Sequence, residues 1–365
     1  MPTGANVSSE FSDEIVFFTT GDGGGIVRDV FDPIVAEARS RGYNATYSND
    51  FNRNAKIGYY CEHNYVMPNV NSDLSIVTFH GIDDSIQRNY YMSEKWRQYD
   101  IGLLPGEAAA KRWQSVSWHP FSKPRMGVYR VGWPKSDHLY SNEFNATVKA
   151  EATERGVRSG STILYAPTLE SDNKALEFMN AVEGDFENIL IKLGPYDDAD
   201  LTELLGSHMN NDDLHILDNS MDIMTTLAMA DIVVSDQSSV LVEAILTETI
   251  PVSVTDWPIQ WGDSPSYPGK TLPEFAIQTT RNELQTSLQQ IKQKSESYLS
   301  ELQEQKQKHF DNLGSAAPTV IDLIEDCIQF GSPTLEPVPR KVTRWRPHPE
   351  RMKTDLISLI KKLER

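Results

Sequence analysis

A group of small polar side chains directly follows an apolar run in the segment ADIVVSDQSSVLVEA, residues 230–244. The group contains Ser235, Asp236, Ser238 and Ser239, at the point where a buried strand gives way to a helical pattern. The first turn of a helix presents N–H groups without intrahelical partners and a partial positive charge. Serine hydroxyls in that position either cap the helix or donate hydrogen bonds to an anion such as phosphate. A cap needs one serine, so the three present here predict a phosphate-binding site.

A histidine, His80, directly follows another apolar run in the segment SIVTFHG, residues 75–81. Gly81 permits a sharp turn behind it. An imidazole has an ordinary pKa of about 6.5, so it can take a proton from a hydroxyl near neutral pH. A single histidine is often structural, but ligands of open α/β sheets bind just beyond the strand ends. This position therefore favours His80 as a general base.

Three further residues carry weaker signals. Thr168, in the segment LYAPT, is placed to donate a hydrogen bond to a phosphate. Gly132, in VGWPKSD (131–137), stands in an ordinary turn sequence when it is taken alone. Glu243 lies one turn into the helix, where it either accepts from a ribose hydroxyl or belongs to a solvated helix face. All three are candidates for binding a nucleotide donor.

A glycine-rich loop, TTGDGGG at residues 19–25, follows the first apolar run. The loop contains Gly21, Asp22, Gly23 and Gly24. It lacks the GxGxxG spacing of a dinucleotide loop, so we expect an acceptor loop instead. No DxD-type pair of carboxylates is evident near a strand end, and a helix N-terminus can stabilise a leaving phosphate in place of a metal. We therefore expect neither a metal nor a cofactor.

Apolar runs that alternate with helix-like segments must position these side chains. The first series consists of EIVFFTT (14–20), SIVTFHG (75–81), YDIGLLPG (99–106) and RMGVYRVGWP (125–134). The second consists of STILYAPT (161–168), ENILIKL (187–193), LHILD (214–218), DIVVSD (231–236) and IPVSV (250–254). Strands that alternate with helices predict parallel βαβ units, and continuously apolar strands are typical of sheets buried on both faces. The pattern predicts an α/β protein with two Rossmann-like, doubly wound domains.

Helical patterns separate the apolar runs. Residues 26–42 predict an amphipathic helix, which Gly42 ends, and residues 108–113 begin another helix. Residues 281–311 predict one long, polar and exposed helix.

The boundary between the two series falls in a polar, Gly-containing segment at residues 149–161. We expect an acceptor domain at residues 1–155, a donor-nucleotide domain at 156–335 and a basic tail or helix at 336–365. Residues 340–365 hold nine Lys or Arg against three Asp or Glu, with apolar residues at helical spacing. Such a segment either lies on an anionic membrane surface or docks on the acidic body of the protein.

The composition narrows the class of protein. A net charge of −18 and an isoelectric point of about 4.9 argue against nucleic-acid binding, which needs a basic face. An acidic excess of this size is found both in halophilic proteins and in ordinary acidic ones. Two distant cysteines form no disulfide framework or metal cluster, which favours a reducing cytoplasmic setting. The first residues lack the features of a signal peptide, and no apolar run is long enough to span a membrane. We expect a cytoplasmic protein, peripheral on the inner face of the membrane if the tail binds lipid.

The succession of strand-end motifs resembles the CDP-glycerol glycerophosphotransferase family, the teichoic-acid polymerases and primases. It is also similar to the wider group of B-type (GT-B) glycosyltransferases and UDP-sugar 2-epimerases. The resemblance covers about residues 75–255 and rests on His-Gly at 80–81, Pro-Gly at 105–106, VGWPKSD and ILYAPT. Its most specific part is ADIVVSDQSS.

The resemblance implies a mechanism and a set of partners. It implies two Rossmann-like domains that face a central cleft, with the active site in that cleft. It also implies that His80 deprotonates an acceptor hydroxyl, while Asp236, Ser238 and Ser239 hold the phosphate groups of the donor. The implied reaction moves a glycerophosphate or other polyol phosphate from a CDP-alcohol to a polymer, glycan or lipid-linked acceptor, in cell-surface polymer or glycan synthesis.

Gly194, in IKLGPYDD (191–198), departs from the resemblance, which has a histidine there in a Lys-x-His-Pro type sequence. Either Lys192 or another group supplies the missing cation, or the donor differs, or activity is reduced. Two alternatives therefore stay open: a UDP-sugar-dependent GT-B glycosyltransferase or epimerase, and a nucleotide-binding subunit that has lost catalysis.

Overall fold

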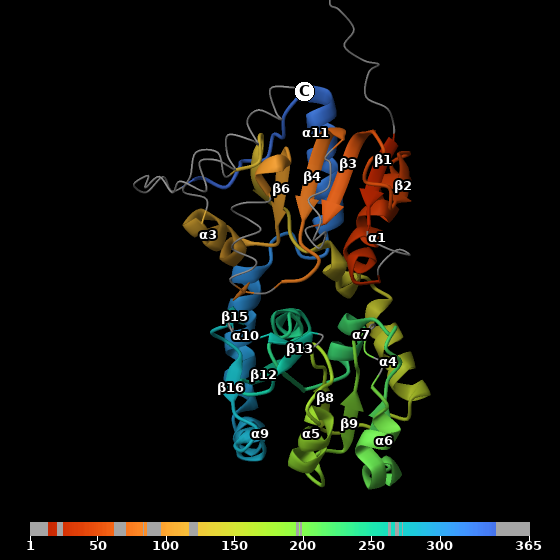
Figure 1. The fold of residues 1–365 in the computed structure, drawn as a ribbon, viewed down its shortest axis with the longest axis vertical. Coiled ribbons are helices and arrows are strands. Elements are labelled where there is room, and N and C mark those ends of the chain that lie inside the picture. Colours follow the sequence, from red (N-terminus) through yellow and green to blue (C-terminus); the bar gives the residue numbers. More distant parts are fainter. Residues whose placement is uncertain are drawn as a thin grey trace, which may run out of the picture. The chain divides into compact units, whose positions relative to one another are not determined.

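The computed structural model describes residues 14–19, 25–61, 71–82, 84–85, 96–116, 123–194, 197, 199–261, 264–266, 270–271 and 273–340. The chain packs into two compact units. The first comprises Met1–His80, Asn89–Asp137 and Phe310–Arg365, and the second comprises Gly81–Arg88 and His138–His309. Each unit is built around one six-stranded sheet (Figure 1).

The sheet of the first unit is parallel throughout, in the order β2-β1-β3-β4-β6-β7. Its strands are β1 (Glu14–Phe18), β2 (Asn44–Ser48), β3 (Ala55–Cys61), β4 (Ser72–Thr78), β6 (Ile101–Leu104) and β7 (Gly127–Arg130). Its helices are α1 (Gly25–Ser40), α3 (Glu107–Val116) and α11 (Ala316–Phe330), with the 3-10 turn η2 (Trp96–Gln98). A second 3-10 turn, η3 (Pro134–Tyr140), begins in the first unit and ends in the second. All four residues of β1 after Glu14 and all of β6 are buried, as continuously apolar strands require.

The main sheet of the second unit is also parallel, in the order β10-β9-β8-β11-β12-β16. Its strands are β8 (Thr162–Tyr165), β9 (Asn188–Ile191), β10 (Leu214–Ile216), β11 (Ile232–Ser235), β12 (Ile250–Val254) and β16 (Ile277–Thr279). Its helices are α4 (Phe144–Glu154), α5 (Lys174–Val182), α6 (Leu201–Leu205), α7 (Ile223–Ala228), α8 (Val240–Glu243), α9 (Leu284–Gln293) and α10 (Ser295–His309), with 3-10 turns η4 (Gly206–Asn210) and η5 (Ala244–Leu246). Two antiparallel ribbons pair β13 (Ile259–Trp261) with β14 (Ser264–Ser266) and β15 (Lys270–Thr271) with β5 (Asp84–Ser85).

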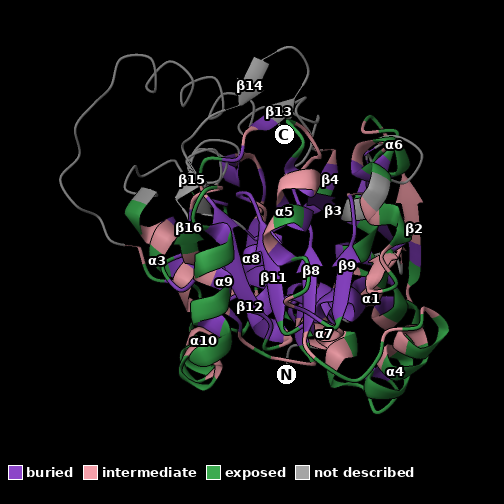
Figure 2. Ribbon diagram, turned by 90° about the horizontal axis from the view of Figure 1, so that it is seen from below, coloured by how far each residue is buried: buried purple, intermediate pink, exposed green. Residues whose placement is uncertain are grey.

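The predicted α/β class with two parallel sheets is confirmed. Figure 2 shows the strands β8, β9, β11 and β12 as buried, while α9 and α10 present exposed surfaces. The prediction of one helix over 281–311 is wrong, because α9 and α10 are separate helices with Lys294 between them. α9 buries Leu284, Leu288 and Ile291, whereas Leu302 is the buried residue of α10. The two helices thus bury different numbers of apolar side chains. The polar sequence of residues 281–311 did not show where one helix ends and the next begins.

The packing differs from the linear division expected from the sequence. Residues 138–155 pack with the second unit, and α11 returns to the first unit, where it contacts α1. The Arg41 guanidinium, just after α1, forms ion pairs with Asp322 at 2.5 Å and Glu325 at 3.0 Å, both on α11. A contact across so many residues leaves no local sequence signal.

A short segment at residues 335–339 lies along β7, the last strand of the first sheet. The Val338 N–H donates to the Val128 carbonyl at 2.8 Å, and Val338 is buried. The Gln114 amide of α3 donates to the Pro339 carbonyl at 2.7 Å. These bonds fix the segment, named here the strap, against the edge of the sheet.

Among the described helices, none is both long enough and apolar enough to cross a bilayer.

Candidate functional site

The carboxyl ends of three strands meet in the second unit, where parallel α/β sheets bind ligands. The Ser235 hydroxyl, at the end of β11, donates to the Ala166 carbonyl after β8 at 2.6 Å. The Ser253 hydroxyl of β12 donates to the Asp236 carbonyl at 2.5 Å. Both serines are fully buried. Ser235 therefore joins neighbouring strand ends, and its predicted contact with a donor phosphate stays a prediction.

The Asp236 carboxylate is the centre of this junction. Its oxygens accept from the Thr168 hydroxyl at 2.7 Å, the Thr168 N–H at 3.1 Å and the Gln237 N–H at 2.7 Å. The Asp236 side chain is 0% exposed. This buried carboxylate is engaged by two loops within the protein. A direct contact between Asp236 and the donor stays a prediction, and an indirect role through Thr168 fits its surroundings.

Lys174, the first residue of α5, is a site residue that the sequence did not reveal. Its Nζ lies 3.0 Å from Asp236 Oδ2 and also donates to the Leu169 carbonyl at 2.5 Å. The Lys174 side chain is 0% exposed. Taking two charges out of water is costly unless they pair closely and their remaining hydrogen bonds are satisfied, as they are here. A lysine in the first turn of a helix normally lies in solvent, so no local signal marked this one.

The hydroxyls that remain near solvent belong to Thr168, Ser238 and Ser239, which are half-buried. Ser239 is the N-cap residue of α8 but makes no side-chain capping bond. The Ser238 hydroxyl accepts from the Val240 N–H at 3.3 Å, so it serves as the local cap. The predicted helix begins here as expected, but α8 spans only Val240–Glu243 before the 3-10 turn η5.

Glu243 and Lys192 lie deeper than the sequence suggested. Glu243 is only 3% exposed, so the interpretation as a solvated helix face is wrong. Lys192 is 6% exposed, and its Nζ donates to the Asn219 carbonyl at 3.1 Å and the Leu193 carbonyl at 3.4 Å. Their contacts with a ribose or a phosphate stay predictions.

Two acids, the half-buried Glu170 and the buried Asp197, link the neighbouring loops. The Tyr165 hydroxyl donates to Glu170 Oε2 at 2.5 Å, and the Glu170 N–H donates to Asp197 Oδ2 at 2.5 Å. Burial raises the pKa of the Glu170 carboxyl, against the lowering effect of the Tyr165 hydroxyl. Burial also raises the pKa of Tyr165 well above its usual value. The Asn219 amide donates to the Asp197 carbonyl at 2.9 Å, so the loops after β8, β9 and β10 are joined.

Gly194 adjoins this junction. A Cβ atom at Gly194 would have the Thr168 carbonyl oxygen as its nearest neighbour, at 3.7 Å. This is an ordinary van der Waals distance, so the position has room for a Cβ atom.

His80 belongs to the first unit, two residues beyond the end of β4, and is half-exposed. The preceding residue, Phe79, is buried, and its ring centroid lies 4.6 Å from that of Trp96. This packing anchors the backbone next to His80. The predicted position at a strand end is confirmed, and the role as a base stays a prediction.

The motif VGWPKSD serves the packing of the first unit. Gly132 has φ +93°, and a Cβ atom there would lie 2.4 Å from the Asp311 carbonyl oxygen and 2.8 Å from Ala316 Cβ. The Asp137 carboxylate accepts from the N–H groups of Ala316 at 3.0 Å and Ala317 at 2.7 Å, at the start of α11. The Arg130 guanidinium pairs with both oxygens of the Asp311 carboxylate at 2.5 and 2.6 Å. The structure therefore gives Gly132 a packing role, and its predicted contact with a donor stays a prediction.

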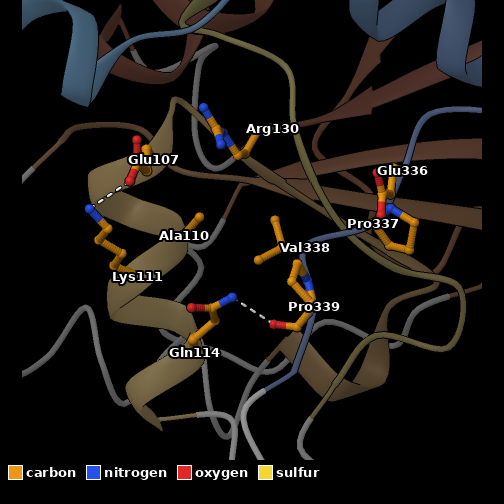
Figure 3. A pocket seen from close by; sticks show the side chains of 9 residues that line it. All are labelled: Glu107, Ala110, Lys111, Gln114, Arg130, Glu336, Pro337, Val338 and Pro339. Atoms are coloured by element: carbon orange, nitrogen blue, oxygen red, sulfur yellow. Dashed lines mark hydrogen bonds and ion pairs between the residues drawn. The ribbon is translucent and has the colours of Figure 1, made fainter.

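A pocket of about 430 Å³ in the first unit lies between α3 and the strap (Figure 3). Its polar side chains are largely engaged within the unit: Lys111 pairs with Glu107, Arg130 with Asp311, and Gln114 with the strap. The remaining lining consists of Ala110 and the strap, which contributes Glu336 and the apolar Pro337, Val338 and Pro339. Most polar side chains of this pocket therefore already have partners within the protein, and few are left to bind a charged substrate.

Several predicted features lie outside the described residues, namely the loop with Gly21, Asp22, Gly23 and Gly24, and the segment 341–365. Within the described ranges, no cluster of three or more His, Cys, Asp or Glu side chains is arranged to hold a metal ion.

Comparison with known proteins identifies relatives. The sequence model described as CDP-glycerol:poly(glycerophosphate) glycerophosphotransferase matches residues 80–326. The wall teichoic acid polymerase TagF has a similar structure, with a TM-score of 0.62, 16% identity, and 87% of this chain and 90% of that chain covered. A putative UDP-N-acetylglucosamine 2-epimerase from Listeria monocytogenes has a TM-score of 0.53 at 12% identity, with 89% and 99% covered. A search of curated protein sequences gave no significant match. The family match confirms the resemblance seen in the strand-end motifs.

Proposed function

The chain belongs to the CDP-glycerol:poly(glycerophosphate) glycerophosphotransferase family, and from this premise we propose how its residues perform the transfer. The protein is a transferase of this class, and its donor is CDP-glycerol or a closely similar CDP-alcohol. The acceptor is a hydroxyl of a polymer, a glycan or a lipid-linked sugar. An acceptor of the last kind would place the enzyme at the inner face of the membrane, with residues 340–365 as its contact.

The reaction exchanges one P–O bond for another. The acceptor oxygen attacks the β-phosphorus of the donor, and the bond from that phosphorus to the oxygen shared with the α-phosphorus breaks. CMP leaves with the electron pair of that bond, and the glycerophosphate is joined to the acceptor. His80 takes the proton of the attacking hydroxyl, which makes the oxygen a better nucleophile. No cofactor enters this balance.

The donor phosphates bind at the start of α8 in this proposal. The observation that carries it is the pair of half-exposed hydroxyls of Ser238 and Ser239, which directly follow the loop held by the buried Asp236. Ser239 has no capping duty, so its hydroxyl is available to a ligand. Fixed hydroxyl and N–H donors stabilise the charge that develops on a leaving phosphate without moving during the reaction.

A UDP-sugar transferase is the second candidate, and Gly194 favours it. The resemblance places a donor-binding histidine at this position, and a smaller residue there suits a different donor. The same strand-end hydroxyls would bind a uridine diphosphate equally well. Discrimination between the two donors therefore has to come from contacts with the nucleobase and with the transferred group.

The test is release of nucleotide from CDP-glycerol and from UDP-N-acetylglucosamine, each with a short glycerophosphate polymer as acceptor. We expect CMP from the first donor and no UDP from the second. UDP without CMP would overturn the proposal in favour of the sugar transferase, and neither product would favour a subunit without catalysis. His80→Ala should reduce the CMP rate by about 10²- to 10⁴-fold and leave CDP-glycerol binding unchanged. Near-normal turnover in this variant would remove His80 as the base.

A further inference from the structure

A buried ion pair adjoins the hydroxyls that face the proposed donor. Lys174 Nζ and Asp236 Oδ2 lie 3.0 Å apart, and both side chains are 0% exposed. We propose that Lys174 is a positioning residue of the donor site: it neutralises the carboxylate that fixes Thr168, so that the site can accept a phosphate. This inference rests on the proposed function.

The loop junction is built around one acceptor group. The Thr168 N–H, the Thr168 hydroxyl and the Gln237 N–H all point at the Asp236 carboxylate. These donors come from the ends of two strands, β8 and β11, which pair directly in the sheet. An ionised carboxylate makes stronger hydrogen bonds to such donors than a neutral amide does. Asp236 thereby sets the backbone from which Ser238 and Ser239 extend.

The same carboxylate would harm an anion site if it stood alone. Ser238 is two residues away from Asp236, so a phosphate held by the Ser238 hydroxyl lies near this charge. Interactions between charges are strong where water is excluded, and repulsion would weaken phosphate binding. Lys174 cancels the charge from the interior side and remains fully buried, so it need not touch the ligand. The other buried lysine at these strand ends, Lys192, is directed to the Asn219 and Leu193 carbonyls.

Two single variants should change donor affinity in opposite directions. Lys174→Met leaves the carboxylate without its partner, and we expect CDP to bind more weakly by a factor on the order of ten. Asp236→Asn leaves the ammonium, and we expect CDP to bind more tightly than in the wild type. The double variant Lys174→Met/Asp236→Asn removes both charges and should return towards the wild-type Kd. A purely structural role would weaken binding in all three variants, because each disturbs the same junction.

The experiment is calorimetric titration of the full-length wild type and the three variants with CDP and, separately, with cytidine. Cytidine carries no phosphate, so its affinity should not follow the charge of the site. Weaker CDP binding in both single variants, or equal shifts for CDP and cytidine, would overturn the inference.

Urea unfolding of the same samples keeps the test usable if a variant is unstable. If Lys174→Met does not fold, the comparison between Asp236→Asn and the double variant still tests the inference. In that comparison, Asp236→Asn must bind CDP more tightly than the double variant. If the wild type binds neither CDP nor UDP, the proposed function fails and this inference fails with it. If the wild type binds CDP but the opposite signs are missing, the inference alone fails.

Discussion

Asp137 and Asp236 each follow a parallel strand in a motif of small and polar residues, Asp236 directly after β11 and Asp137 seven residues after β7. The Asp137 carboxylate accepts from the first N–H groups of α11, so these N–H groups are not available to a ligand. The Asp236 carboxylate accepts from a neighbouring loop and pairs with Lys174, and the serines that follow it remain half-exposed. A polar strand end becomes a ligand site only where donors are left over after the protein has satisfied its own acceptors.

The largest effect that would test this contrast is expected at Gly132, on the packing side. Gly132→Val forces a β-branched side chain into a left-handed backbone conformation and against the Asp311 carbonyl at 2.4 Å. We expect a loss of about 3 kcal/mol in the free energy of unfolding, measured in urea. The folded fraction should bind CDP-glycerol normally. Unchanged stability with lost binding would instead make Gly132 a donor contact, as the sequence suggested.

Asp137 should give the next largest effect. Asp137→Ala removes the acceptor for two N–H groups at the start of α11, so we expect a loss of about 1–2 kcal/mol in the free energy of unfolding. Asp137→Asn keeps one acceptor oxygen and serves as the matched control, with a smaller loss. A change in donor affinity without a change in unfolding would break the contrast between the two aspartates.

Ser239 tests the ligand side. Ser239 makes no capping bond, so Ser239→Ala should change the free energy of unfolding by less than about 0.5 kcal/mol. Calorimetric titration with CDP-glycerol should show an affinity about tenfold lower, equivalent to about 1.4 kcal/mol. Ser238→Ala is the matched comparison, because it also removes the acceptor of the Val240 N–H and should lose stability. If Ser239→Ala instead lowers the free energy of unfolding and leaves the affinity for CDP-glycerol unchanged, the Ser239 hydroxyl has a structural role.

Asp222 is the N-cap residue of α7, and its carboxylate accepts from the Thr225 N–H at 2.8 Å, so it tests helix capping away from the ligand site. Burial raises the pKa of its carboxyl, but hydrogen bonds from His138 and Thr225 outweigh burial and lower the pKa below its usual value. A depressed pKa in the folded state stabilises the protein above the unfolded value, near 4, and this stability is lost as the pH falls further. Asp222→Ala should lower the free energy of unfolding by about 1 kcal/mol at pH 7 and by progressively less towards pH 2. Urea unfolding at several pH values measures this difference. A constant difference across this range would show that the carboxylate charge does not matter.

Gly194 should give the smallest effect on stability. Gly194→Ala places a Cβ atom 3.7 Å from the Thr168 carbonyl, an ordinary contact, so unfolding should change by less than about 0.5 kcal/mol. Gly194→His should then raise the affinity for CDP-glycerol, because it adds a donor next to the proposed phosphate site. Weaker binding in the histidine variant, with the alanine variant unaffected, would mean that the site needs the space.

The sequence predicted many of the strands, including the half-exposed β10, but it missed the buried β3, whose sequence AKIGYYC carries Lys56 and Gly58. β11 and β12 are continuously apolar and were found, whereas β2, with the sequence NATYS, is mostly half-exposed at the edge of its sheet and carries no apolar run. The strand-end serines were found for the same local reason. Lys174 was not, because its partner lies 62 residues away and nothing in its own neighbourhood shows that it is buried.

The strap has a consequence for how the molecules meet one another. The outermost strand of a sheet offers its backbone to any other strand, which is a common route to aggregation. The Val338 N–H donates a hydrogen bond to the Val128 carbonyl of β7. The residues on either side of Val338 are prolines, which have no N–H to donate. A chain shortened to residue 334 would return that edge to open solution and should self-associate. Five residues that resemble a linker thus cover the outer edge of the first sheet.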